Sequence, residues 1–283
     1  MQNKSNRYLG LELAGARNQK TSLAVLEYYP REEKTFLLEI CDKIFDEDSS
    51  NDQRLLDVIQ EHSEGGAKVL AVNVPMELPP CITCSRSVCP LPTHCSVPAV
   101  KWMREFEKAG KRKGGAKKRR RDITPYTQRP VELFLRQQVL SKISAHAQFE
   151  IDETLGGSKA PLTARMNFLK RHLKKANLIE VSPKLSIALL SERLSLHKRV
   201  ISSYRKLEEG AHARSEILEM LGKEYGVFIY EKDLRRLSQS LAAFDAFVCA
   251  YTGLLFDIGR CVKPPRGFPE KTGWVHYPMT VNV

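Results

Sequence analysis

Alternating apolar and polar positions in the first part of the chain predict a small sheet with a helix packed against it. The alternation favours strands at residues 7–14, 21–29 and 35–40, which would form an antiparallel meander. Apolar residues at helical spacing then predict a helix at residues 51–62. A nearly continuous apolar run follows at residues 69–74, as expected of a central strand that is covered on both faces.

The rest of the chain alternates between helices and strands. The predicted elements are a helix at residues 162–173, a strand at 178–181, a helix at 211–221 ended by Gly222, a short strand at 226–230 and a long apolar helix at 239–256. Ser182 and Pro183 provide a strong helix start directly after the second of these. The pattern therefore predicts an α/β protein with a mixed sheet, in which three antiparallel strands precede parallel ones.

Four of the seven cysteines lie within fifteen residues, at Cys81, Cys84, Cys89 and Cys95. A disulfide framework spreads its cysteines to join distant loops, whereas this spacing suits a knuckle around one ion. Four thiolates complete the tetrahedral shell of Zn²⁺ and leave no vacant position for a substrate, so the predicted ion is structural. A four-iron, four-sulfur cluster also takes four cysteines and stays an alternative, as do four free thiols.

The net positive charge of the chain indicates what kind of partner it binds. The 283 residues include 45 Lys and Arg against 33 Asp and Glu, which gives a formal net charge of +12. An excess of this size favours a polyanion, and we expect nucleic acid, although a basic surface also serves solubility. The N-terminal residues show no secretory apolar segment, and the apolar tract at residues 241–256 is shorter than the ~20 residues of a membrane span. We therefore expect a cytoplasmic protein with no membrane partner.

Much of the positive charge is concentrated in one segment, residues 111–121. Eight of these eleven residues are basic: Lys111, Arg112, Lys113, Lys117, Lys118, Arg119, Arg120 and Arg121. Lys and Arg side chains that meet backbone phosphates release counterions, which gives affinity without sequence preference. The segment is therefore predicted to bind nucleic acid, and a solvated loop is the alternative.

Asp245 interrupts the long apolar helix of the second half. Ala242, Cys249 and Thr252 share its helix face, and their small side chains would let this face approach the sheet closely. A carboxylate at such a position must be paired, hydrated or bound to a cation, because an isolated buried charge costs several kcal/mol.

Three further polar residues occupy the ends of predicted strands. Asn73 ends the central apolar run and is either a satisfied core amide or part of a site, and Glu180 ends the strand before Ser182. Glu12 alternates with the leucines of the first strand, so the pattern by itself indicates a solvated face for its carboxylate.

Seven short segments resemble, in their order, the DUF429 family of predicted ribonuclease H-like nucleases. They are GLELAG, AVNVPMELP, PYTQR, PLTAR, IEVSP, SLAAFDAFVCAYTGLL and GWVHYP, at residues 10–15, 71–79, 125–129, 161–165, 179–183, 240–255 and 273–278. The resemblance implies one ribonuclease H-like domain over residues 1–283, with helices on both faces of the sheet. Residues 78–130 would then insert the cysteine knuckle and the basic loop into it. It also implies that Glu12, Asn73 and Asp245 gather to hold Mg²⁺ or Mn²⁺ for catalysis, with Glu180 as a fourth member.

The chain departs from the family pattern at two of these positions. Glu12 stands where an aspartate is usual, and Asn73 stands where an aspartate is expected, so one ligand brings no charge to the cation. Glu77, four residues on, is a candidate replacement. Two functions follow: a cation-dependent phosphodiesterase, or a nucleic-acid-binding protein that keeps the fold with a weakened site. A phosphotransferase of the related actin-like fold is a more distant alternative, because its phosphate-binding glycine loops are missing.

Overall fold

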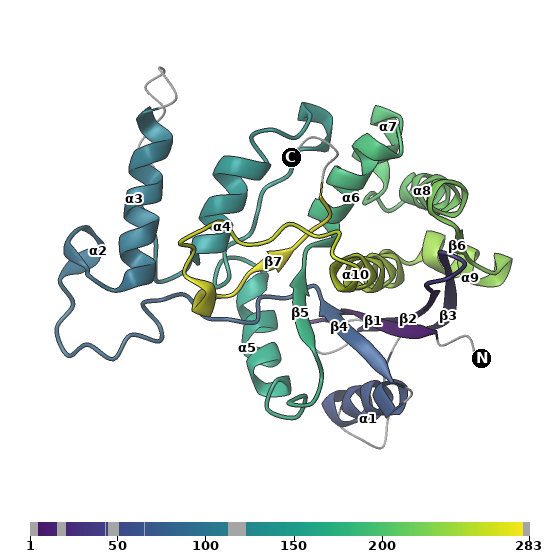
Figure 1. Ribbon diagram of the computed structural model, residues 1–283, viewed down its shortest axis with the longest axis horizontal. Coiled ribbons are helices and arrows are strands. Elements are labelled where there is room, and N and C mark those ends of the chain that lie inside the picture. Colours follow the sequence, from purple (N-terminus) through teal and green to yellow (C-terminus); the bar gives the residue numbers. More distant parts are fainter. Residues whose placement is uncertain are drawn as a thin grey trace.

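The computed structural model describes residues 5–15, 21–42, 44, 51–64, 66–112 and 123–279. Within these residues one mixed sheet (Figure 1) contains β1 (Asn6–Glu12), β2 (Ser22–Tyr29), β3 (Lys34–Asp42), β4 (Ala67–Val72), β5 (Leu178–Val181), β6 (Val227–Phe228) and β7 (Val275–His276). Their order across the sheet is β6-β3-β2-β1-β4-β5-β7. β1, β2 and β3 pair antiparallel, whereas β4 is parallel to β1, β5 to β4 and β7 to β5. The predicted meander followed by parallel strands is confirmed, and β1, β4 and β5 end at the same edge of the sheet.

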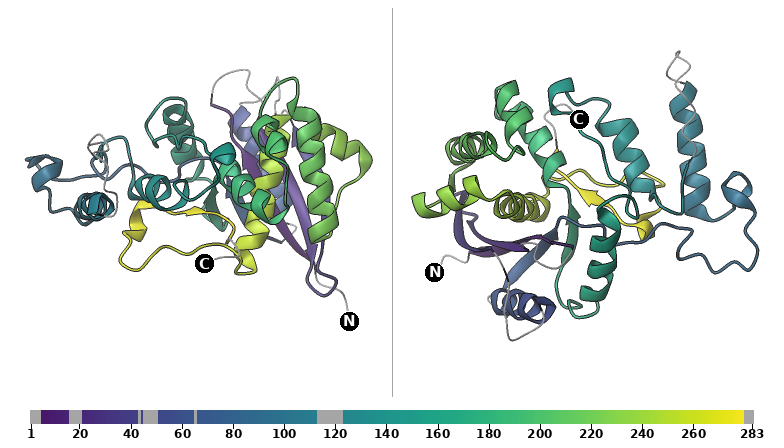
Figure 2. Two further views of the ribbon diagram at one scale, coloured as in Figure 1. Left: turned by 90° about the horizontal axis from the view of Figure 1, so that it is seen from above. Right: turned by 180° about the vertical axis from the view of Figure 1, so that it is seen from behind.

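Helices cover both faces of this sheet (Figures 1 and 2). On one face, α1 (Asn51–Glu64) and α5 (Lys159–Leu169) bury Leu55, Ile59 and Met166 against the leucines of β1. On the other face lie α6 (Pro183–Arg193), α8 (Gly210–Tyr225) and α10 (Leu241–Asp257). α10 runs directly against β1, β2 and β4, which explains why it is apolar on nearly every side.

The cysteine-rich segment stands apart from the sheet at one end of the molecule. It contains α2 (Leu91–His94) and α3 (Pro98–Arg112), which Figures 1 and 2 show projecting beyond α4 (Pro130–Phe134). Aromatic rings anchor it, because Trp102 of α3 meets Phe268 edge-on at 5.3 Å and Phe106, which stacks on Trp102 at 4.6 Å, packs against Phe134 of α4 at 5.8 Å. The segment is thus attached to α4 and to the C-terminal part of the chain rather than to the sheet.

Several helix boundaries differ from the sequence prediction; α5, for example, spans Lys159–Leu169 rather than residues 162–173. α8 does not end at Gly222 but continues to Tyr225, because Gly226 takes the left-handed conformation (φ 63°) that terminates it. The long C-terminal helix begins at Leu241 rather than 239, because the Ser240 side chain accepts a hydrogen bond from the backbone N–H of Ala243.

The residues before Ser240 form a separate helix, α9 (Glu231–Gln239), which the hydrophobic pattern did not predict. The short helix α7 (Lys198–Ser203) was also missed. In the described part of the chain no single helix is long and apolar enough to cross a membrane, although α9 and α10 together, bent by 113°, pass that test by length and composition.

Candidate functional site

The close approach of α10 to β1 determines where a site can form. A Cβ atom at Gly10 would lie 2.8 Å from the Cα of Ala250, and closer still to the Ala250 nitrogen and the Ala246 carbonyl oxygen. The helix backbone therefore rests directly on β1. Glu12, two residues on, points to the same face as Gly10, so the face expected to be solvated is covered by α10. The alternation with leucines was misleading here. Gly10 is small because the backbone of α10 rests on it, and Glu12 is a polar residue on the same covered face.

Glu12 and Asn73 meet at the ends of adjacent parallel strands. Leu11 of β1 pairs with Val72 of β4, which brings Asn73 beside the last residue of β1. The Asn73 backbone N–H donates to the Leu11 carbonyl at 3.0 Å, and its side-chain Nδ2 donates to Glu12 Oε2 at 2.6 Å. The prediction that these two residues come together is therefore consistent with the fold.

Asp245 is buried at 1% exposure and faces Arg205, which follows α7. Nη1 of Arg205 lies 3.0 Å from both carboxylate oxygens of Asp245. Burial raises the pKa of Asp245, and the guanidinium of Arg205 opposes this effect. Burial and then the nearby charge of Asp245 raise the pKa of Glu12 to about 8, although Asn73, Lys159 and Arg205 act in the other direction. The two carboxylates from opposite ends of the chain are thus electrostatic neighbours.

A cavity of about 240 Å³ opens beside Glu12 at the carboxyl ends of β1, β4 and β5. Its wall carries four cationic side chains: Arg129, Lys159 at the start of α5, Lys184 in the first turn of α6, and Arg205. Burial lowers the pKa of Lys184, and the charge of Arg205 lowers it further. Asp152 also lines the cavity, so acidic and basic groups face one space. Such a space suits an anionic ligand together with a cation.

Glu180 lines the same cavity, but its carboxylate is already engaged. Arg129 donates from Nη1 to Oε2 at 2.8 Å and from Nη2 to Oε1 at 2.6 Å, and the Met76 backbone N–H adds a third hydrogen bond at 3.0 Å. Arg129 is 1% exposed and also contacts Glu132, through Nε at 2.9 Å and its backbone N–H at 2.7 Å. Although burial lowers the pKa of Arg129, the charges of Glu180 and Glu132 raise it above its usual value. Glu180 therefore belongs to a buried ion network in the wall of the site.

Several of these residues were not singled out from the sequence. Arg129 lies in the PYTQR segment and Lys159 shortly before PLTAR, but a basic residue in a basic chain gives no distinct signal. The spacing of Arg129, Pro130 and Glu132 does match a helix start, with Glu132 at the third helical position, and this signal was available. Glu77, the candidate replacement for Asn73, pairs with Lys170 at 2.6 Å and does not line the cavity.

The four clustered cysteines are free thiols, Cys95 buried and Cys84 and Cys89 exposed. Burial and then the charges of the other three raise the pKa of Cys81, so the four are near one another. Arg104 of α3 supports the segment by donating to the carbonyl of Cys95 at 2.9 Å. Within the described ranges they form no group of three ligand atoms all within 4.8 Å, and a Zn²⁺ knuckle stays a prediction. Residues 113–121 of the basic loop, and the side chains of Lys111 and Arg112, lie outside the described residues.

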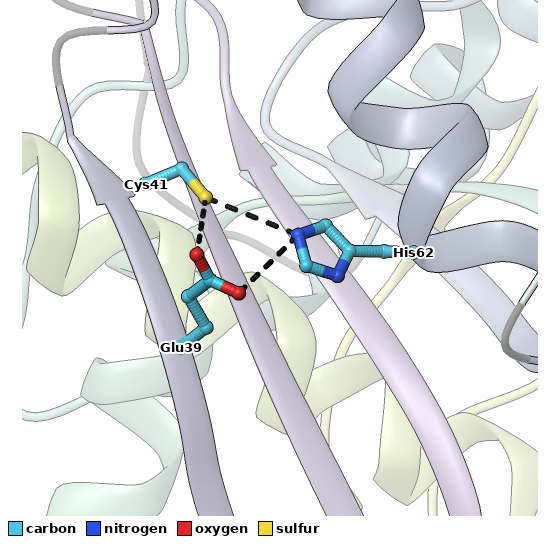
Figure 3. A group of neighbouring side chains, drawn as sticks. All are labelled: Glu39, Cys41 and His62. Atoms are coloured by element: carbon cyan, nitrogen blue, oxygen red, sulfur yellow. Dashed lines mark hydrogen bonds and ion pairs between the residues drawn. The ribbon is translucent and has the colours of Figure 1, made fainter.

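One group of side chains does have a spacing that could hold a metal ion. Glu39 and Cys41 of β3 and His62 of α1 bring their ligand atoms within 4.8 Å of one another (Figure 3). It was not identified from the sequence, because His62 lies 21 residues after Cys41 in another element and the three residues form no motif.

A family model described as a protein of unknown function, DUF429, matches residues 19–270. This chain belongs to the DUF429 family. The match includes Asn73, Glu180 and Asp245 of the DUF429 chain, whereas Glu12 lies before its first residue. No curated protein and no solved structure matches the chain.

Proposed function

We propose that this DUF429 protein is a divalent-cation-dependent nuclease with a ribonuclease H-like fold, which hydrolyses phosphodiester bonds of DNA or RNA. The meeting of Glu12 and Asp245 carries the proposal. They come from the first strand and the last long helix and lie close enough for the charge of Asp245 to raise the pKa of Glu12, and Glu12 lines a cavity with four cationic side chains. Two like charges in a desolvated position are stabilised by a cation between them.

The donor set fits Mg²⁺ or Mn²⁺, which prefer carboxylate, amide and water oxygens. Glu12 and Asp245 would hold the cation, and Asn73 would add its amide oxygen after rotating about its terminal torsion. A bound cation polarises a phosphoryl oxygen and lowers the pKa of coordinated water. Lys159 and Lys184, which line the same cavity, would bind the phosphate oxygens and orient the scissile bond.

Arg205 would control how readily the cation binds to Asp245. Its guanidinium already neutralises Asp245, so a cation must compete with it for the carboxylate. Arg205 is 33% exposed and lines the cavity, which gives its side chain room to move onto a phosphate when it leaves Asp245. Ligand binding and cation binding would therefore favour each other.

The nuclease test is cleavage of labelled single-stranded and duplex DNA and RNA in Mn²⁺ or Mg²⁺. We expect cleavage that EDTA abolishes and that Asp245→Asn and Glu12→Gln reduce by at least about 100-fold, since changes in groups that only support metal ligands already cost 10–100-fold. Asp57→Asn, an exposed carboxylate of α1, is the matched control and should retain full activity. Cleavage that survives in Asp245→Asn would contradict the proposal.

The second candidate is a nucleic-acid-binding protein of the same fold without catalysis. The contact of Asn73 with Glu12 favours it, because an amide brings no charge and Arg205 offsets Asp245, which leaves Glu12 as the uncompensated carboxylate. Under this alternative the wild type binds nucleic acid and does not cleave it, and Asn73→Asp does not produce cleavage. Under the nuclease proposal, Asn73→Asp increases the rate.

Nucleic acid is the proposed partner in both cases, with the basic loop at residues 111–121 as a contact and Zn²⁺ as the proposed structural ion of the cysteine segment. The charge excess of +12 supports nucleic acid as the partner. The close spacing of Cys81, Cys84, Cys89 and Cys95 supports Zn²⁺ as the structural ion.

A further inference from the structure

A mixed group of nitrogen, oxygen and sulfur ligands lies on the face of the sheet opposite to Glu12. Glu39 and Cys41 are two residues apart on β3, and His62 lies in the last turn of α1, which packs on that face (Figure 3). Cys41 Sγ lies 3.5 Å from Glu39 Oε1 and 4.0 Å from His62 Nε2, and His62 Nε2 lies 3.6 Å from Glu39 Oε2.

These separations are close to those of a tetrahedral ion. Bonds of about 2.0–2.3 Å from Zn²⁺ to nitrogen, oxygen and sulfur, at tetrahedral angles, set the ligand atoms about 3.3–3.8 Å apart. The distances from Glu39 to Cys41 and to His62 fall in this range but run to different oxygens of its carboxylate, so Glu39 would place one oxygen by turning about its terminal torsion. The 4.0 Å between Cys41 and His62 needs a shift of a few tenths of an ångström. The side chains are thus nearly preorganised for an ion of this size.

The local fold gives these side chains their direction. The pairing of β2 with β3 shifts register between Val25 and Leu26, a bulge that lets both Leu37 and Ile40 pack in the core beneath α10. Glu39 and Cys41 consequently point to the other face, toward α1. β6 pairs only with Thr35 and Phe36, so in the described residues this end of β3 has no strand on its outer side.

Solvent access and charge also suit a cation. Glu39 is 53% exposed, so an ion reaches the group without a change of fold. Glu61 is near enough to act on Cys41 electrostatically, whereas the nearby cation, Arg236, is held by Asp42 at 2.5 Å and Asp233 at 3.3 Å. Nothing in these contacts places a positive charge in the position that an ion would take.

We propose that Glu39, Cys41 and His62 form a binding site for Zn²⁺ or a similar borderline cation, with water as the fourth ligand. Cysteine, histidine and carboxylate ligands together select such a cation over Mg²⁺. The bound ion links the end of α1 to the outer strand of the meander. This site is separate from the proposed nuclease site and does not depend on it.

Titration with Co²⁺ tests the site, because a cobalt–thiolate bond gives a charge-transfer absorption band. The full chain would carry Cys84→Ser and Cys89→Ser, two exposed positions, so that the cysteine segment does not contribute. We expect a thiolate band that saturates with one Co²⁺ at this site and that Zn²⁺ removes by displacement, whereas Co²⁺ held by the carboxylates of the proposed nuclease site gives no such band. Cys41→Ser should eliminate the band, and Glu39→Gln and His62→Ala should each weaken binding at least tenfold.

His212→Ala changes an exposed histidine of α8 and is the matched control, with no expected effect. If Cys41→Ser fails to fold, Co²⁺ binding by Glu39→Gln tests the site instead. Glu39 is exposed, so its substitution leaves the core intact. A background protein that gives no cobalt–thiolate band, or a band and affinity unchanged by these substitutions, would show that the three side chains are only neighbours.

Discussion

At the level of single residues, Gly10 determines whether Glu12 and Asp245 can meet. Because the backbone of α10 rests on Gly10, the next residue on that face of β1, Glu12, lies level with the start of the helix, where Asp245 is placed. A larger residue at position 10 would push the helix away from the strand and separate the two carboxylates.

Gly10→Ala should therefore destabilise the protein strongly. Overpacking costs about 1–3 kcal/mol and more when backbone must move, and here the added carbon meets backbone atoms of Ala246 and Ala250. Urea unfolding would measure the decrease in stability, which we expect at about 3 kcal/mol or above. Gly253→Ala, in α10 itself, is the control, since its added carbon would meet side chains of Ala71 and Val69 at 3.3–3.4 Å and no backbone atom. Equal effects of the two substitutions would contradict this packing.

Glu12 gives the stability of the protein a dependence on pH. Its folded-state pKa is about 8, above the ordinary value of 4.5, so the folded protein holds a proton that the unfolded chain has released between these values. Stability from this group is complete below pH about 4.5 and falls as the pH rises toward 8. Glu12→Gln, which stays neutral, should be more stable than the wild type at pH 8, with the difference shrinking toward pH 5. A constant difference in denaturation free energy across this range would be inconsistent with the raised pKa.

At the level of helices and strands, the ion network of Arg129, Glu132 and Glu180 joins α4 to β5. Arg129 holds Glu132 on its own helix and Glu180 at the strand end, and Thr154 donates a further hydrogen bond to Glu132. Both carboxylates are buried, so each depends on the same guanidinium for its charge. The network fixes the wall of the cavity next to Glu12.

Arg129→Met should cost about 3–5 kcal/mol at neutral pH, because it leaves two buried carboxylates without a counter-charge. Adding Glu132→Gln and Glu180→Gln should recover most of that stability, since no unpaired charge then remains. Thermal or chemical unfolding of the single and triple variants provides the comparison. An Arg129→Met protein close to the wild type in stability would mean that the ion network contributes little to the free energy of folding.

The sequence predicted elements better than it predicted contacts between them. The strand at Leu178–Val181 and the helix start at Ser182 and Pro183 have purely local signals, and both were predicted correctly. α9 was missed because its apolar content is low, and the end of α8 was misplaced because two glycines, Gly222 and Gly226, offered competing stops. The partners of Asp245 and Glu180 could not be predicted, because Arg205 and Arg129 lie 40 and 51 residues away in sequence.

At the level of the protein as a whole, the proposed binding segment and the proposed reaction site belong to different parts of the chain. The basic loop, residues 111–121, begins in the last turn of α3, whereas Glu12 ends β1 and Asp245 lies near the start of α10. The loop would supply affinity for a polyanion, and the sheet edge would supply the reaction. The two contributions can be tested independently.

Neutralising Lys117, Lys118, Arg119 and Arg120 should weaken nucleic-acid binding uniformly across sequences. The slope of log affinity against log salt on duplex DNA should flatten by up to about 0.9 for each phosphate that the protein no longer neutralises. Neutralising four exposed basic residues elsewhere, Arg171, Lys174, Lys175 and Lys198, is the matched control for net charge. If both quadruple variants change the slope equally, the loop has no special role.

The melting temperature in Mn²⁺ tests the proposed cation site most directly, measured for the wild type, Asp245→Asn, Asn73→Asp and the control Asp57→Asn. Mn²⁺ is suitable because it prefers oxygen ligands over the thiols found elsewhere in the chain. At about 100 times the dissociation constant, an ion that binds the folded state adds about 2.7 kcal/mol of stability, which is a rise of several degrees. We predict this rise in the wild type and Asp57→Asn, a larger rise in Asn73→Asp and none in Asp245→Asn. A full rise in Asp245→Asn would remove Asp245 from the cation site and contradict the proposed nuclease.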